Sequence, residues 1–262
     1  MISWRAKRQL VAILVLFFLV VIVFAVNYRR FVPISTCFDN KQNQGEIGID
    51  CGGPCASCEL KNPKPISVFW TRAVPVRDNV YDVAAYIENP NIQIGSADIE
   101  YEFSVFDEVG LVARRTGTTF ILPQEKTHIV EAGLETSRQP TRVEFKISGI
   151  KWQIPQNNKP SLIVEKRDYK IMNENGTNQS ILDATIFNNS PHSLREAEVN
   201  FIILDKDSNL LGANHTLVND FSAGSRRAVR TTWPNVLKGD AAVIEIDPRI
   251  DIFNPDYVLK PR

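Results

Sequence analysis

The chain has 262 residues with 30 basic and 30 acidic side chains, so its formal net charge is zero at pH 7. The five basic residues before position 31 leave 25 basic against 30 acidic residues in the remainder, which is therefore mildly acidic. This balance argues against a protein that binds nucleic acid through its phosphates. After an anchor of about 30 residues, the rest is long enough for two domains of ordinary size.

The first feature along the chain is an uncharged apolar run from Leu10 to Val26. As a helix it would reach about 26 Å, which suits a bilayer core of about 30 Å once the flanking polar and aromatic residues are added. We predict that residues 1–30 form a cytoplasmic tail and a transmembrane anchor. Basic residues on both sides of the run favour a cytoplasmic N-terminus only narrowly. The alternative is a cleaved signal peptide that ends near Ala25.

All four cysteines lie in one window after the anchor, at Cys37, Cys51, Cys55 and Cys58. The window has too few apolar residues for a hydrophobic core, so covalent closure must hold it. Two disulfides with three possible connectivities are expected outside the cytosol, and zinc at the C-x13-C-x3-C-x2-C spacing is the alternative. We assign residues 31–65 to a cysteine-rich juxtamembrane stem and linker, and the clustered cysteines favour an extracytoplasmic C-terminus.

The same window contains four possible calcium ligands, Asp39, Asn43, Glu46 and Asp50. They depart from the EF-hand pattern, because Lys41 occupies a ligand position and Gly45 is one place too late. Turn formation by Asn, Asp and Gly is the simpler explanation. No cofactor is predicted.

Beyond the linker the sequence alternates with the period of a β-strand. From Asp98 to Val105, the apolar residues Ile99, Tyr101 and Phe103 alternate with polar ones, which predicts an antiparallel strand buried on one face. Residues 142–147 repeat this pattern. No stretch beyond the anchor has a sustained helical period, so the expected fold class is mainly β.

A second segment repeats the first at a spacing of 98 to 100 residues. The matched residues are Phe103, Val105 and Asp107 with Phe201, Ile203 and Asp205, and Asn89 with Asn189, where Phe187 precedes the second Asn. We predict two tandem immunoglobulin-like β-sandwiches, residues 66–153 and 160–262, that fold independently and form a rod. The apolar motif residues would enter each core, and each Asp would open the next hairpin by accepting hydrogen bonds from backbone amides.

Two short motifs resemble known families. Residues 103–107 and 201–205 resemble the Phe-x-Leu-Tyr-Asp signature of FxLYD-type domains, which are immunoglobulin-like modules of bacterial envelope proteins. The cysteine window resembles the Asp-Cys-Gly-Gly-x-Cys-x-x-Cys motif of extracellular and envelope proteins, at Asn43, Gly45, Glu46, Asp50, Cys51, Gly52, Gly53, Cys55 and Cys58. These resemblances imply a fold and an exported location, and neither implies a reaction or a ligand.

The sequence contains no recognisable catalytic motif, since GxSxG, P-loop, GxGxxG and HExxH patterns are all missing. His128, His192 and His215 are not at metal-ligand spacing, and we expect them at the surface or in turns. We predict a single-pass, non-enzymatic envelope protein for protein interaction, adhesion or scaffolding. Its partners would be the lipid bilayer through Leu10 to Val26 and an envelope protein or a second copy. The alternatives are a subunit of a secretion or surface-appendage complex, and a sensor or hydrolase with an unrecognised site.

Overall fold

The computed structural model describes residues 4–31, 37–174 and 176–259. The chain divides into two compact units, Met1–Lys61 and Asn62–Arg262. Residues 1–3 of the expected cytoplasmic tail and residues 32–36 of the expected stem lie outside the described residues.

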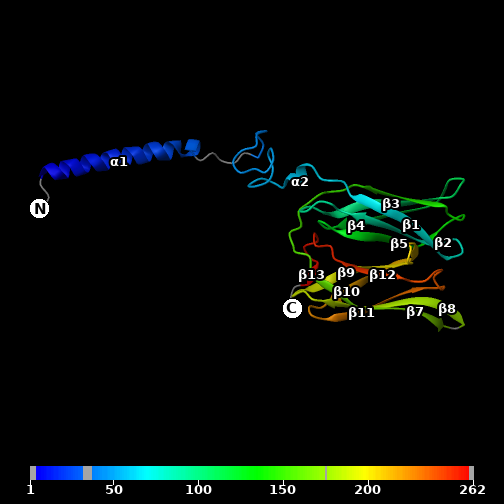
Figure 1. Cartoon of the computed structure of the whole chain (residues 1–262). Coiled ribbons are helices and arrows are strands. Elements are labelled where there is room, and N and C mark those ends of the chain that lie inside the picture. The colour runs from blue at the N-terminus through cyan, green and yellow to red at the C-terminus, as the bar shows by residue number, and fades with distance from the viewer. Residues whose placement is uncertain (1–3, 32–36, 175, 260–262) are drawn as a thin grey trace. The chain divides into compact units, whose positions relative to one another are not determined.

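The first unit begins with helix α1 (Trp4–Phe31), which is blue in Figure 1. Its segment Lys7–Tyr28 is long and apolar enough to cross a membrane, and the predicted run lies inside it. Near the end of this segment the side chain of Asn27 donates a hydrogen bond to the Val23 carbonyl at 2.8 Å, so its amide is satisfied within the helix. The unit ends with the short helix α2 (Cys58–Lys61).

The second unit is made of antiparallel strands. Strands account for 52% of the described structure and helices for 11%, which confirms the expected mainly β class. The strands of the first half are β1 (Ser67–Arg77), β2 (Val80–Glu88), β3 (Ser96–Phe106), β4 (Leu111–Ile121), β5 (Lys126–Glu135) and β6 (Arg142–Ser148). Those of the second half are β7 (Leu162–Glu174), β8 (Thr177–Asn188), β9 (Ser193–Leu204), β10 (Leu210–Phe221), β11 (Arg226–Trp233), β12 (Val243–Arg249) and the short β13 (Val258–Leu259).

The two halves have the same strand order. The first half contains the sheets β1-β2-β5 and β4-β3-β6, and the second contains β7-β8-β11 and β10-β9-β12, with β13 also paired to β9. Adding six to each strand number of the first half therefore gives the main sheets of the second. This correspondence agrees with the repeat that the sequence contains.

Each half has its own apolar core between its two sheets. Phe103 on β3 and Phe201 on β9 are fully buried and hold equivalent places, opposite Phe145 and Ile246 on the neighbouring strand. The first core includes Val83, Ala85, Ile87, Ile99, Tyr101, Phe103 and Val105. The second includes Leu182, Ala184, Ile186, Val199, Phe201 and Ile203.

The structure corrects the match of Asn89 to Asn189 by one residue. The buried side chain of Asn89 donates to two backbone carbonyls at 2.7 and 2.9 Å, and the buried side chain of Asn188 does the same at 2.9 and 3.1 Å. Asn189 is exposed. Because strand residues alternate between faces, the shift replaces Phe187 with Ile186 at the core position.

The two halves stack face to face, so the expected rod is wrong. Sheet β1-β2-β5 packs on sheet β10-β9-β12, and the second unit in Figure 1 appears as successive layers of strands. The apolar residues of this junction are Ala84, Val130, Ile202, Leu204, Leu210 and Ala213, with Trp70 and Val74 against them. Strands β2 and β9 are consequently buried on both faces.

Candidate functional site

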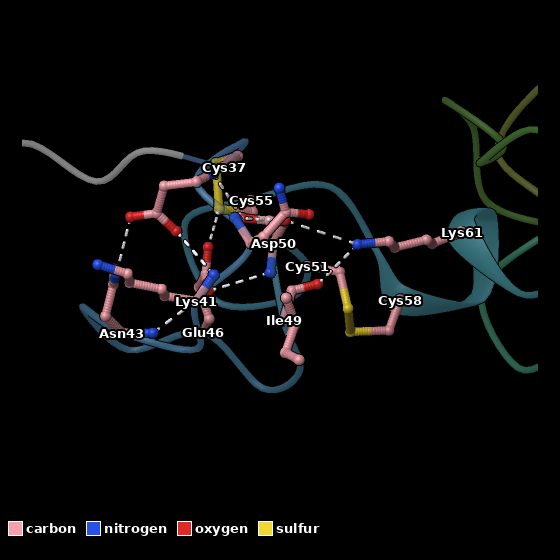
Figure 2. Close-up of a disulfide and its surroundings, with 12 residues drawn as sticks. Cys37, Lys41, Asn43, Glu46, Ile49, Asp50, Cys51, Cys55, Cys58 and Lys61 are labelled. Atoms are coloured by element: carbon pink, nitrogen blue, oxygen red, sulfur yellow. Dashed lines mark hydrogen bonds and ion pairs between the residues drawn. A yellow bond between two sulfur atoms is a disulfide. The ribbon is translucent and has the colours of Figure 1, made fainter.

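The cysteine-rich segment is closed by two disulfides, which confirms that prediction. Cys37 pairs with Cys55 and Cys51 pairs with Cys58, a connectivity that the spacing alone does not determine. Figure 2 shows both bonds within one small group of loops, which we call the knot (residues 37–61). Because all four sulfurs are paired, none is a thiolate that could bind zinc, and the zinc alternative does not apply to this structure.

Three of the four possible calcium ligands, Asp39, Glu46 and Asp50, act as acceptors inside the knot, and the fourth, Asn43, acts as a donor. Asp50 accepts hydrogen bonds from the backbone amides of Asp39 and Asn40 at 2.9 and 3.1 Å. Glu46 accepts from the amides of Asn43 and Asp50 at 3.3 and 3.1 Å, and Asp39 accepts from the Asn43 side chain at 2.9 Å. These contacts hold turns in place, so the carboxylate oxygens are engaged by the protein itself, whereas the side-chain oxygen of Asn43 is buried and accepts no hydrogen bond within the described residues.

The structure explains why the motif has glycine at both positions 52 and 53. Both have left-handed backbones, with φ of +75° at Gly52 and +57° at Gly53. A Cβ atom on Gly53 would lie 2.1 Å from the carbonyl oxygen of Gly45, and one on Gly52 would lie 2.6 Å from the Cβ of Ile47. The compact crossing of the knot loops therefore requires glycine at both positions.

A second candidate site is the junction between the halves, where charged side chains are buried. Arg249 on β12 is fully buried; its Nε donates to Glu125 at 3.2 Å and its Nη2 donates to the Phe120 carbonyl at 2.6 Å. A Glu198 oxygen lies 3.5 Å from its Nη1. Burial alone would lower the pKa of Arg249, but the charges of Glu125 and Glu198 raise it above its ordinary value, so the guanidinium stays charged.

His128 on β5 lies in the same junction and is buried, which corrects the expectation that it is a surface or turn residue. Burial and the charge of Arg249 lower the pKa of its imidazole to about 4, so the ring is neutral at pH 7. Its 3.6 Å contact with Glu245 is therefore not an ion pair at that pH. The side chains of His192 and His215 are exposed.

Asp82 on β2 is a third buried group that links the halves. The indole of Trp233 donates to it across the junction at 3.1 Å, and the backbone amide of Gly133 donates at 2.9 Å. Burial raises the pKa of this carboxyl to about 6 in spite of both hydrogen bonds. In a further link, the Thr127 hydroxyl donates to Asp247 at 2.7 Å.

Two clefts open along the junction. The smaller has a volume of about 590 Å³ and contains both cations and carboxylates, including Arg195, Glu196, Glu198, Arg249 and Asp251. The larger has a volume of about 1050 Å³ and runs beside β1; its charged lining residues are Arg72, Arg77, Asp78, Arg142 and Lys238. The smaller cleft is lined by charges of both signs, whereas the larger cleft is lined by four basic side chains and one carboxylate.

The motif residues of the two repeats have structural roles. Phe103, Val105, Phe201 and Ile203 are buried in the cores. Asp107 accepts hydrogen bonds from two backbone amides of its turn at 2.8 and 2.9 Å, and Asp205 accepts from two at 2.8 Å, as the sequence predicts. The side chain of Arg138, which donates to Asp107, lowers the pKa of that carboxyl to about 2. None of these residues lines either cleft.

One feature of the sequence indicates the junction. Residues 201–204 of β9 are four consecutive apolar residues, and all four are buried. In a strand with one solvent-exposed face, apolar and polar residues alternate, whereas a continuous apolar run indicates burial on both faces. The charged pair of Glu125 and Arg249 gives no such signal, because its members are far apart in the chain.

No protein-family model matches the chain, and no curated protein matches it. The likeness of residues 103–107 and 201–205 to the FxLYD signature thus depends on those residues alone and stays a prediction. The knot and the junction are the features from which a function can be proposed.

Proposed function

We propose that the chain is a membrane-anchored, exported, non-catalytic protein of a bacterial cell envelope that presents its β unit to another protein. The observation that carries this proposal is the pair of disulfides in the knot. Disulfides form and persist in oxidising compartments outside the cytosol. Because only residues 32–36 separate α1 from Cys37, the knot and the β unit belong on the extracytoplasmic side and the N-terminus in the cytoplasm.

In this proposal the two halves are immunoglobulin-like sandwiches of the FxLYD type. Two antiparallel sheets around one core in each half support it, as does the Asp turn that follows each motif. Sandwiches of this kind offer strand edges and end loops for recognition. Binding to another envelope protein and association with a second copy both fit that arrangement.

The proposed topology can be tested in spheroplasts. Protease added outside should degrade the β unit and leave an N-terminal tag protected, with a cytosolic marker protein as the control for lysis. Alkylation without reductant should modify none of the four cysteines, and alkylation after reduction should modify all four. A protected C-terminus with a cleaved N-terminal tag, or four thiols that react without reductant, would contradict the proposal.

The interaction role can be tested by crosslinking in intact cells followed by mass spectrometry of the copurified proteins. We expect a defined envelope partner or a second copy of the chain. The matched control is a chain that ends after residue 65, which keeps the anchor and the knot and should lose the partner. Recovery of the full chain alone would count against an interaction protein.

A further inference from the structure

The larger cleft, which we call the β1 groove, follows one edge of a sheet. Its lining includes residues 71–73 and 75–77 of β1 on one side and residues 139–143 before and within β6 on another. The second half of the unit closes it with residues 209–210, 233 and 235–238. The groove is thus an open channel along β1 at the place where the two halves meet.

The edge of β1 that faces the β1 groove has unpaired backbone groups. Among the described strands β1 pairs with β2 alone, and the ladder is interrupted by a bulge between Pro75 and Arg77. The side chain of Asn235 donates to the carbonyl of Val76 in that bulge at 2.8 Å. The Val76 carbonyl is therefore already occupied, and its bond shows that an amide donor from outside the sheet can reach this edge, as the amides of an added strand would.

Three of the four cations of the β1 groove lack carboxylate partners, whereas the fourth, Arg142, pairs with Glu144. Within the described part of the chain, Arg72, Arg77 and Lys238 form no ion pair, although Arg72 donates to the Ser208 carbonyl. Elsewhere in the unit, five arginines are paired with acids, Arg114, Arg115, Arg138, Arg226 and Arg230, whereas Arg195 and Arg227 donate to backbone carbonyls. The groove is therefore a basic region within an exported part that is acidic overall.

We infer that the β1 groove binds an extended acidic peptide segment of a partner protein, which adds as a strand to the free edge of β1. Backbone hydrogen bonds to residues 71–77 would supply affinity, and carboxylates on alternate residues of the peptide would face Arg77 and Lys238. At about 3.3 Å per residue, this stretch of β1 is about 23 Å long, which suits a peptide better than a small anion. The inference rests on the proposed function and names the chemistry of its partner.

The test uses the full chain in detergent micelles and a fluorescent peptide of alternating Glu and Val residues, about eight in all so that it covers the edge. Arg77→Glu combined with Lys238→Glu should weaken binding at least about tenfold, because like charges would then face each other. The matched control combines Lys146→Glu with Lys166→Glu. Both lysines are exposed, form no ion pair with a described residue and lie outside the groove, so this pair should change affinity less than about twofold.

A second pair of probes separates strand addition from attraction between charges. A peptide of the same sequence with methylated backbone nitrogens keeps its charge but cannot complete a ladder, so it should bind at least about tenfold more weakly. The backbone amides of residues 71–74, 76 and 77 that point away from β2 should become protected from hydrogen exchange when the unmodified peptide binds. Three results would overturn the inference: equal binding of the methylated peptide, binding of dextran sulfate alone, or no binding of either peptide. Pro75 and the cations would then serve to protect the edge of β1 against pairing with other chains.

The failure of this inference can be told apart from that of the proposed function. If the Arg77→Glu and Lys238→Glu chain still captures the same partner in intact cells, the β1 groove is not the contact and the interaction role stands. If the wild-type chain captures no partner and the protease test places the β unit in the cytosol, the proposed function itself fails. Loss of capture by this variant but not by the Lys146→Glu and Lys166→Glu control would support both.

Discussion

At the scale of single residues, Arg249 holds the junction together. Replacement by Met would remove one partner from a buried pair and leave the carboxylate of Glu125 in the interior without its buried cation, since its remaining cation, Lys159, is exposed and lies 4.0 Å away. We expect a loss of about 3–5 kcal/mol in the free energy of unfolding, measured by urea denaturation of the full chain. The control is Arg230→Met, whose ion pair with Asp183 is largely exposed and should contribute no more than about 1 kcal/mol. Equal losses would contradict a special role for Arg249.

Two buried groups at the junction respond to pH in opposite directions. The carboxyl of Asp82 has a pKa of about 6 in the folded chain and 3.8 as its ordinary value, so between these values the folded chain binds more protons and acidification adds stability. The imidazole of His128 has a pKa of about 4 against an ordinary 6.5, so the unfolded chain binds more protons and acidification removes stability. The two contributions oppose each other over nearly the same range.

Single substitutions should separate these contributions. In Asp82→Asn, stability should fall more steeply than in the wild type as pH decreases from 6 to about 4, by about 3 kcal/mol over the range. In His128→Gln, the fall between pH 6.5 and about 4 should be smaller than in the wild type, by a similar amount. Urea denaturation at several pH values provides the measurement. Parallel pH profiles for all three chains would show that neither group titrates as described.

At the scale of elements, the sequence predicts a strand well when one face of the strand is exposed to solvent. Residues 98–105 alternate, and β3 has the expected core residues Ile99, Tyr101 and Phe103. It predicts the register of β8 poorly, because Ile186 and Phe187 are both apolar although only Ile186 is buried, so hydrophobicity alone does not show which residue enters the core. The disulfide pairing and the buried network follow from contacts between distant residues, which no local pattern encodes.

The knot offers a test of one element in isolation. Gly53→Ala would bring a Cβ to 2.1 Å from the Gly45 carbonyl oxygen and should lower the fraction of chains with the Cys37–Cys55 and Cys51–Cys58 pairing several-fold. Gly45→Ala is the matched control, because Gly45 also has a positive φ but has no atom within 4 Å of the added Cβ. Peptide mapping without reduction gives the pairing. If Gly45→Ala is equally harmful, backbone strain and not the close approach is responsible.

At the scale of the whole molecule, the stacked arrangement changes what the two halves can do separately. The sequence predicts two domains that fold independently, whereas the structure places both in one compact unit with a junction of apolar residues and buried charges. Separating the halves would expose Ala84 and Ile202 to water and would leave Arg249 without Glu125. We therefore expect the halves to unfold in one cooperative transition.

This coupling can be tested by a core substitution in one half and a measurement of hydrogen exchange in the other. Phe103→Ala should cost about 3–5 kcal/mol, a large share of the stability of an ordinary domain. If the halves are coupled, hydrogen exchange should show a loss of protection in β8 as well as in β2, although β8 belongs to the other half. Leu111→Ala, at an exposed position of β4, is the control and should leave both strands protected. Unchanged protection in β8 after Phe103→Ala would instead support two domains that fold independently. The junction would then add contacts without coupling the stabilities of the two cores.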